Sequence, residues 1–120
     1  MMTEAQLQIS YILAQKYYQK KLTTKEVRSM AAKEGISENS QSNYFCSAYR
    51  HLINGTEFKG KLSAYIWEYY LSQIFTEFSV DIKRNALKCF MQAIEYYEAK
   101  SKSNALTLRE IYSRYSAKLS

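Results

Sequence analysis

The stretch Thr23–Tyr44, TTKEVRSMAAKEGISENSQSNY, decides the fold of the first half of the chain. Thr23 followed three residues later by Glu26 forms a capping box, a pattern that predicts the start of a helix. Gly35 can adopt the positive φ angle that ends this helix, and Ser37 can cap the next one. This order of helix, tight turn and helix predicts a helix-turn-helix.

Apolar residues on either side of the turn indicate how the two helices pack. Ala31 is small enough to let the helices approach each other, and Ile36 is expected to fill the space between them. We expect Met30 on the buried face of the helix before the turn and Tyr44 on that of the helix after it. Gln41 falls where such motifs usually bury an aliphatic residue, which weakens the match.

The composition extends the helical prediction to the whole chain. The 120 residues include no proline and three glycines, so few positions interrupt a helix. Hydrophobic periodicity predicts a single all-α domain, a bundle of about six helices that span residues 3–20, 23–34, 38–53, 63–78, 80–99 and 105–119. We expect a helix-turn-helix-like half over about residues 1–61 and a three-helix scaffold or interface half over about residues 62–120.

The net charge and the aromatic content of the chain indicate the class of molecule that it is expected to bind. The net charge is +6, from 17 lysines and arginines against 11 acidic residues, and this balance favours a polyanion such as nucleic acid. Twelve tyrosines are present. A tyrosine can stack on a base, but it also fills the edge of a small core with its hydroxyl in water, and we favour the core-edge interpretation for any single one.

The cysteines and the first residues predict a cytoplasmic protein. Cys46 and Cys89 are the only cysteines, and the opening residues, MMTEAQLQ, lack the cationic stretch and apolar run of a signal peptide. We therefore expect both thiols to be reduced. No apolar run approaches the ~18 residues of a membrane span, so we predict no membrane association.

Residues suited to catalysis are scarce. The chain has one histidine, His51, and one aspartate, Asp81, and a single histidine cannot build a two-histidine zinc site or an HNH-type nuclease centre. Asp81, Glu98 and Lys100 match the Asp…Glu-x-Lys sequence motif of metal-dependent nucleases. In those enzymes the carboxylates lie on adjoining strands, whereas we expect these three residues on a helix, so we interpret the match as a coincidence. The sequence also lacks a glycine-rich phosphate loop. We predict no enzymatic activity, no catalytic residue, no metal site and no cofactor.

The exposed start of the third predicted helix would face the major groove of double-stranded DNA. The candidates for contact with bases are Ser37, Glu38, Asn39, Ser42 and Asn43. Asparagine can pair with adenine through two hydrogen bonds, and glutamate can accept one from cytosine. The candidates for contact with phosphates are Lys16, Lys20, Lys21, Lys25, Arg28, Arg50, Lys59 and Lys61. The alternative interpretation is that these charged residues form a surface that contacts only solvent. We give the two interpretations equal weight.

Several motifs occur along the middle of the chain in a fixed order. Ile36–Ser40 form a turn of the form Ile-x-Glu-Asn-Ser before a helix that contains Tyr44. They are followed by the loop residues Gly55, Phe58 and Lys59, and by the helical residues Tyr69, Tyr70, Glu77, Phe78, Ile94, Tyr96, Tyr97 and Glu98. Through these motifs, residues from about Gly35 to Lys100 resemble the helical domain at the N-terminus of bacterial restriction-type HNH endonucleases. The resemblance implies a domain that delivers a nuclease to DNA, with the nuclease in a separate domain. None of the HNH active-site residues can be carried over.

Together these patterns predict a non-catalytic DNA-binding module related to restriction, defence or mobile-element proteins. The third helix would probe double-stranded DNA while the flanking lysines contact phosphates. A second copy of the chain, giving a homodimer, and a fused or separate nuclease are the candidate protein partners. The alternative is a protein-interaction adaptor of the phage or mobile-element type, in which the aromatic helical surface of the second half docks a partner.

Overall fold

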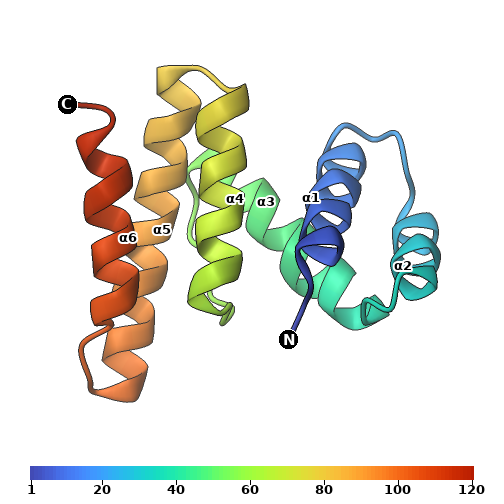
Figure 1. Cartoon of the computed structure of the whole chain (residues 1–120), viewed down its shortest axis with the longest axis horizontal. Helices are drawn as coiled ribbons and strands as arrows, with labels where there is room; N and C mark the ends of the chain where they lie inside the picture. Colours follow the sequence, from blue (N-terminus) through green and yellow to red (C-terminus); the bar gives the residue numbers. More distant parts are fainter. The chain divides into compact units, whose positions relative to one another are not determined.

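The computed structural model describes all 120 residues and is helical throughout, with no strand (Figure 1). The α-helices are α1 (Glu4–Tyr18), α2 (Thr24–Lys33), α3 (Cys46–Asn54), α4 (Ala64–Glu77), α5 (Val80–Ser101) and α6 (Leu106–Ala117). A π-helical segment, η1 (Ser40–Phe45), leads directly into α3. The predicted all-α fold with six helices is confirmed. None of the helices combines the length and apolarity needed to cross a membrane.

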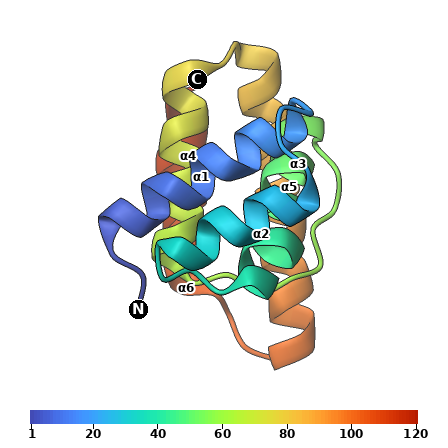
Figure 2. The ribbon, with the colours of Figure 1, turned by 90° about the vertical axis from the view of Figure 1, so that its right-hand side faces the viewer.

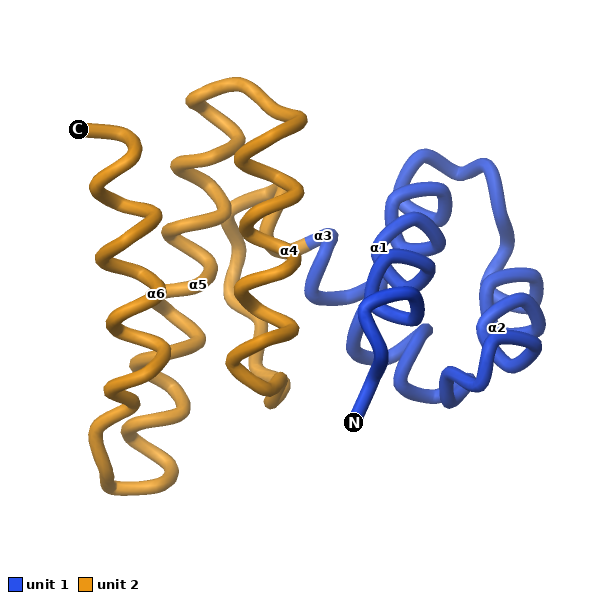
Figure 3. The backbone as a smooth tube through the Cα atoms, in the orientation of Figure 1, with its two compact units in different colours: residues 1–50 blue, residues 51–120 orange.

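The chain forms two compact units, unit 1 over residues 1–50 and unit 2 over residues 51–120 (Figure 3). The division falls within α3, earlier in the chain than the expected meeting of the two halves near residue 61. The reason is that the second part of α3 and the loop after it contact α4 and α5. Phe58 in this loop is buried, and the side-chain amide of Asn85 on α5 donates to the carbonyl of Ile53 at 3.0 Å.

Unit 1 is built from α1, α2 and the η1–α3 helix, which pack on one another (Figures 1 and 2). Tyr49 lies at its centre and is 1% exposed. Its ring makes edge contacts with those of Tyr11 and Tyr18, with ring centroids 5.4 and 5.7 Å apart. The other buried apolar residues of this core are Leu7, Leu13, Ala14, Val27, Ala31, Ile36, Phe45, Cys46 and Ala48.

The turn between α2 and the third helix has the predicted geometry. Gly35 has a φ angle of +76°, and its N–H donates to the carbonyl of Ala32. The N–H of Ile36 donates to the carbonyl of Ala31, which completes a Schellman motif. Ile36 is buried as expected. A Cβ atom at Gly35 would also come within 3.1 Å of Nε2 of Gln6, so the position favours glycine on two grounds.

Two of the three side chains that were expected to cap the start of a helix make the capping hydrogen bond. The Thr23 hydroxyl accepts from the N–H of Glu26 at 3.1 Å, and the Glu26 carboxylate accepts from the N–H of Thr23 at 2.9 Å. The Ser37 hydroxyl accepts from the N–H of Ser40 at 3.3 Å. Ser63 precedes α4 at the cap position, but its side chain makes no capping hydrogen bond.

The third helix begins with the wider turn of η1. The N–H of Cys46 donates to the carbonyl of Gln41, five residues earlier, so this turn is wider than an α-helical one. The buried face of the third helix is formed by Gln41, Phe45, Ala48 and Tyr49, which are at helical spacing. Tyr44 lies off this face and is 44% exposed, so the expectation that Tyr44 is buried is wrong. Met30 is also exposed, at 41%, because Val27 and Ala31 form the buried face of α2.

Unit 2 contains a bundle of three helices, α4, α5 and α6, each of which packs against the other two (Figure 1). The ring of Trp67 on α4 packs between Phe58 and Phe90, at centroid distances of 5.7 and 5.1 Å. The other buried apolar residues are Leu52, Ile53, Ile66, Tyr70, Leu71, Ile74, Ala86, Leu87, Cys89, Ala93, Ile94, Ala105, Ile111 and Tyr115.

Glu98 holds the start of α6 in place, a role that the sequence did not predict. Its carboxylate accepts from the backbone N–H of Ala105 at 2.8 Å. It also accepts two hydrogen bonds from the guanidinium of Arg109, at 2.6 and 2.7 Å. These donors, Arg109 first, lower the pKa of Glu98 from 4.5 to about 2. Asp81, Glu98 and Lys100 all lie on α5, as expected.

Glu98→Gln is expected to lower the thermal midpoint of unfolding at pH 7 by a few degrees. Because the pKa is lowered in the folded state, the carboxylate stabilises the fold fully above its ordinary value of 4.5. This contribution is lost as the pH falls from there towards 2, so the difference between variant and wild type should shrink over that range. Thermal melts followed by circular dichroism measure it, with Glu57→Gln, an exposed carboxylate in the loop before α4, as the control. A difference that does not vary with pH would contradict the assigned role.

Candidate nucleic-acid interface

The five base-contact candidates lie at the start of the third helix, before and within η1. Ser37, Glu38, Asn39 and Asn43 are exposed, and Ser42 is half-buried. The Ser37 hydroxyl is already used as a helix cap. The Ser42 hydroxyl donates to the carbonyl of Glu38 at 3.1 Å and also lies 3.4 Å from Oδ1 of Asn43.

Arg28 on α2 connects to this group of side chains. Its Nη1 donates to the hydroxyl of Ser42 at 2.8 Å and to Oδ1 of Asn39 at 3.1 Å. Its Nε lies 3.7 Å from a carboxylate oxygen of Glu38. The guanidinium thus orients the side chains of the helix start, while its expected contact with phosphate stays a prediction. The Asn39 oxygen keeps a second lone pair and its amide nitrogen keeps two donors, as pairing with a base requires.

A depression of about 390 Å³ lies between the end of α1 and the third helix. It is lined by Tyr17, Tyr18, Lys20, Ser42, Cys46, Ser47 and Arg50. The structure therefore brings two phosphate candidates, Lys20 and Arg50, beside the base candidate Ser42. We call the set Lys20, Arg28, Asn39, Ser42 and Arg50 the Ser42 surface.

Both tyrosines of this depression are held by other residues of unit 1. The hydroxyl of Thr24 donates to that of Tyr17 at 3.1 Å, and the ring of Tyr18 rests against that of Tyr49. Tyr17 and Tyr18 are 39% and 38% exposed. Both tyrosines therefore lie at the edge of the core of unit 1. Ser47 was not predicted as part of the site, and no motif marks it.

The remaining phosphate candidates are not gathered on the Ser42 surface. Lys16 lines a different depression, between α1 and α2, together with Ile12 and Met30. Lys21 and Lys25 are exposed on the loop after α1 and on the first turn of α2. Lys59 and Lys61 belong to the loop before α4 and are part of unit 2.

Gln41 occupies the buried motif position at which an aliphatic residue was expected. It is fully buried, and its Nε2 donates to the carbonyl of Ser10 at 3.1 Å and to Sγ of Cys46 at 3.6 Å. Its Oε1 is buried with no hydrogen-bond partner. Burying a polar group is costly unless it is hydrogen-bonded, and the Ser10 carbonyl offsets part of this cost.

The two cysteines are buried, and the histidine contacts the hydroxyl of a nearby threonine. Cys46 and Cys89 are buried free thiols. Burial raises the pKa of Cys89 to about 12 and also raises the pKa of Cys46, so both stay protonated at neutral pH. Nδ1 of His51 lies 2.6 Å from the hydroxyl of Thr56. No three His, Cys, Asp or Glu side chains are grouped so that they could hold a metal ion.

No family model, curated protein or solved structure matches this chain. The geometry of the Ser42 surface therefore carries the functional proposal.

Proposed function

We propose that this chain is a non-catalytic DNA-binding module whose Ser42 surface contacts double-stranded DNA. The proposal is carried by one observation: Lys20 and Arg50 flank Ser42 around a single depression on a helix-turn-helix. Phosphate contacts position such a protein on the duplex, while contacts with base edges give sequence preference. Both kinds of side chain are present here at neighbouring positions.

The roles of the residues follow from their contacts. Asn39 and Asn43 present amide groups suited to adenine, and Arg28 orients Asn39 by its hydrogen bond to Oδ1. Lys20 and Arg50 supply cations at the edge of the same surface. Charge-assisted hydrogen bonds from such cations to phosphate are among the stronger polar contacts in proteins. Lys16, Lys21 and Lys25 add positive charge elsewhere on unit 1.

The resemblance to the N-terminal helical domain of restriction-type HNH endonucleases supports a place in restriction, defence or mobile-element biology. In this proposal the chain brings a nuclease, fused or separate, to DNA and does not cut it. The protein would act in the cytoplasm, where its two buried cysteines stay reduced.

Binding to random duplex DNA should weaken steeply with salt. If about five cations contact phosphates, the affinity is expected to fall by roughly two to three powers of ten between ~50 and ~200 mM salt, because binding releases condensed counterions. Fluorescence anisotropy of a labelled duplex at the two salt concentrations measures this change. No binding at ~50 mM salt would refute the proposed function.

A further inference from the structure

Two adjoining depressions on unit 2 form one groove, which we call the Lys61 groove. Their volumes are about 330 and 440 Å³, and both are lined by Gly60, Lys61 and Tyr97. The first lies between the loop before α4 and the start of α6, and the second lies beside the end of α5. The groove is separate from the Ser42 surface, because all its residues belong to unit 2.

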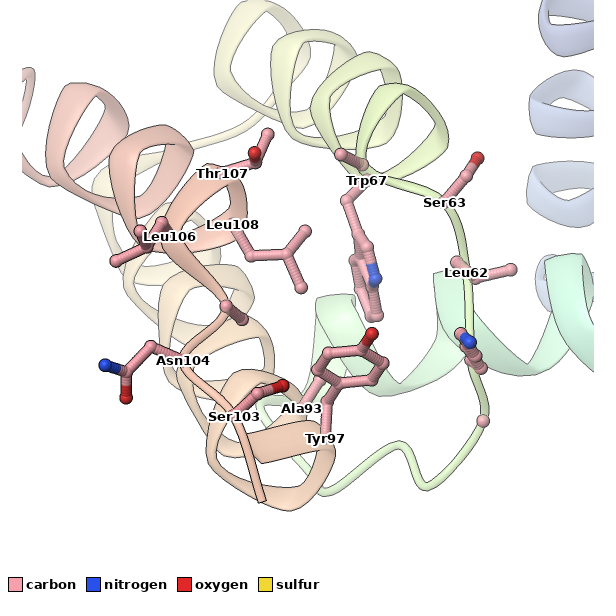
Figure 4. Close-up of a pocket in the computed structure, with 14 residues that line it drawn as sticks. Leu62, Ser63, Trp67, Ala93, Tyr97, Ser103, Asn104, Leu106, Thr107 and Leu108 are labelled. Carbon is pink, nitrogen blue, oxygen red and sulfur yellow. The ribbon is translucent and has the colours of Figure 1, made fainter. Parts of the chain in front are cut away.

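The floor of the Lys61 groove is apolar. Trp67, Tyr97 and Leu108 point toward one another in the first depression, with Ala93 beside them (Figure 4). Leu62 lines the same depression and is half-buried. At its border Leu106 is 72% exposed, an unusual exposure for a leucine. Burying such apolar surface against a partner is favourable because it removes the surface from water.

The rim of the groove is positively charged. Lys59, Lys61 and Lys100 line it, and none of its lining residues is aspartate or glutamate. The nearby carboxylate of Glu98 is engaged with Arg109 and does not neutralise these lysines. The amino ends of α4 and α6 also border the groove, and helix amino ends favour negative charge.

From this combination we infer that the Lys61 groove docks an acidic peptide segment of a partner protein. Aliphatic or aromatic side chains of the segment pack on Trp67, Tyr97 and Leu108, and its carboxylates pair with the lysines of the rim. This is the charge and shape pattern by which an amphipathic segment is recognised in an apolar groove. The inference does not depend on DNA binding by unit 1.

A nucleic acid fits the groove less well than a peptide. Nζ of Lys61 lies over the ring of Tyr97 at 5.3 Å, and Nζ of Lys100 lies over the ring of Tyr96 at 5.6 Å. These cation–π contacts cover one face of each tyrosine that a base would need for stacking. Leu106 and Leu108 suit the apolar side chains of a peptide better than bases.

The test is selection of a random 12-residue peptide library on the immobilised full chain. We expect the selected peptides to be acidic and to contain at least two large apolar residues. Fluorescence anisotropy of one labelled selected peptide then measures its affinity for wild type and variants. Lys61→Glu/Lys100→Glu should weaken it by at least about tenfold, because two attractive charges become repulsive. Leu108→Ser, which keeps the charge, should also weaken it.

Arg84→Glu/Lys88→Glu is the matched control, since it makes the same change of charge at two exposed positions on α5 outside the groove. It should leave peptide affinity close to wild type, and circular dichroism confirms that each variant is folded. No enrichment over uncoated wells, or peptides that bind all variants equally, would overturn the inference. So would a loss of duplex DNA affinity in Lys61→Glu/Lys100→Glu that equals the loss caused by reversing charges on unit 1, since nucleic acid would then be the occupant.

Discussion

Lys20→Glu/Lys21→Glu is expected to weaken binding to duplex DNA by on the order of 100-fold at ~50 mM salt, equally for all sequences. Both lysines are exposed, and Lys20 lines the depression that also contains Ser42 and Arg50. The substitution removes two cations and places two anions against the phosphates. The slope of log affinity against log salt should become shallower by about two, one for each lost phosphate contact.

Fluorescence anisotropy with several duplexes of different sequence measures this effect. Arg84→Glu/Lys88→Glu lowers the net charge equally on unit 2 and is expected to change the affinity much less. An unchanged affinity in Lys20→Glu/Lys21→Glu would remove Lys20 from the interface. Equal losses in the two variants would mean that overall charge, and not the Ser42 surface, attracts the DNA.

Phe90→Ala is expected to lower the free energy of unfolding of unit 2 by about 3–5 kcal/mol. Phe90 is fully buried on α5, with its ring 5.1 Å from that of Trp67 and 6.5 Å from that of Tyr112. Truncation loses the apolar burial of the ring and leaves a cavity in the core of the three-helix bundle. A loss of this size is a large share of the stability of a small domain.

Trp67 reports this change directly, because it is the only tryptophan of the chain and packs against the deleted ring. Urea titration followed by its fluorescence gives the free energy of unfolding. Leu106→Ala serves as the control and should change stability by less than about 0.5 kcal/mol, because Leu106 is exposed. A loss below about 1 kcal/mol in Phe90→Ala would show that Phe90 is not central to this core.

Local sequence signals located the helices and the turn correctly. Thr23 with Glu26, and Gly35 with its positive φ angle, act through neighbours a few residues away, so the sequence contains the whole pattern. The absence of proline left long helices uninterrupted. For five helices the predicted and observed bounds consequently agree to within a few residues, which is the usual uncertainty at helix ends. The third helix, predicted over residues 38–53, is instead observed as η1 followed by α3, which ends at Asn54.

Features that depend on distant contacts were not predictable. Gln41 is buried because the carbonyl of Ser10, 31 residues earlier, accepts its amide hydrogen, and no local pattern encodes this pairing. The hydrogen bonds of Arg28 to Asn39 and Ser42 form only once α2 and the third helix pack, so no local pattern predicts them. Lys20 and Arg50 are 30 residues apart, and only the fold places them around one depression.

The η1 segment has a consequence for comparing this chain with other sequences. A hydrogen bond that spans five residues instead of four accommodates one extra residue in the helix. Without Asn43, Gln41 and Phe45 would be three positions apart, a spacing that still places both on one face of an α-helix. A relative of this protein can therefore be one residue shorter within the third helix and keep the same core. Its alignment to this chain would need a gap in the middle of a helix, where gaps are ordinarily penalised.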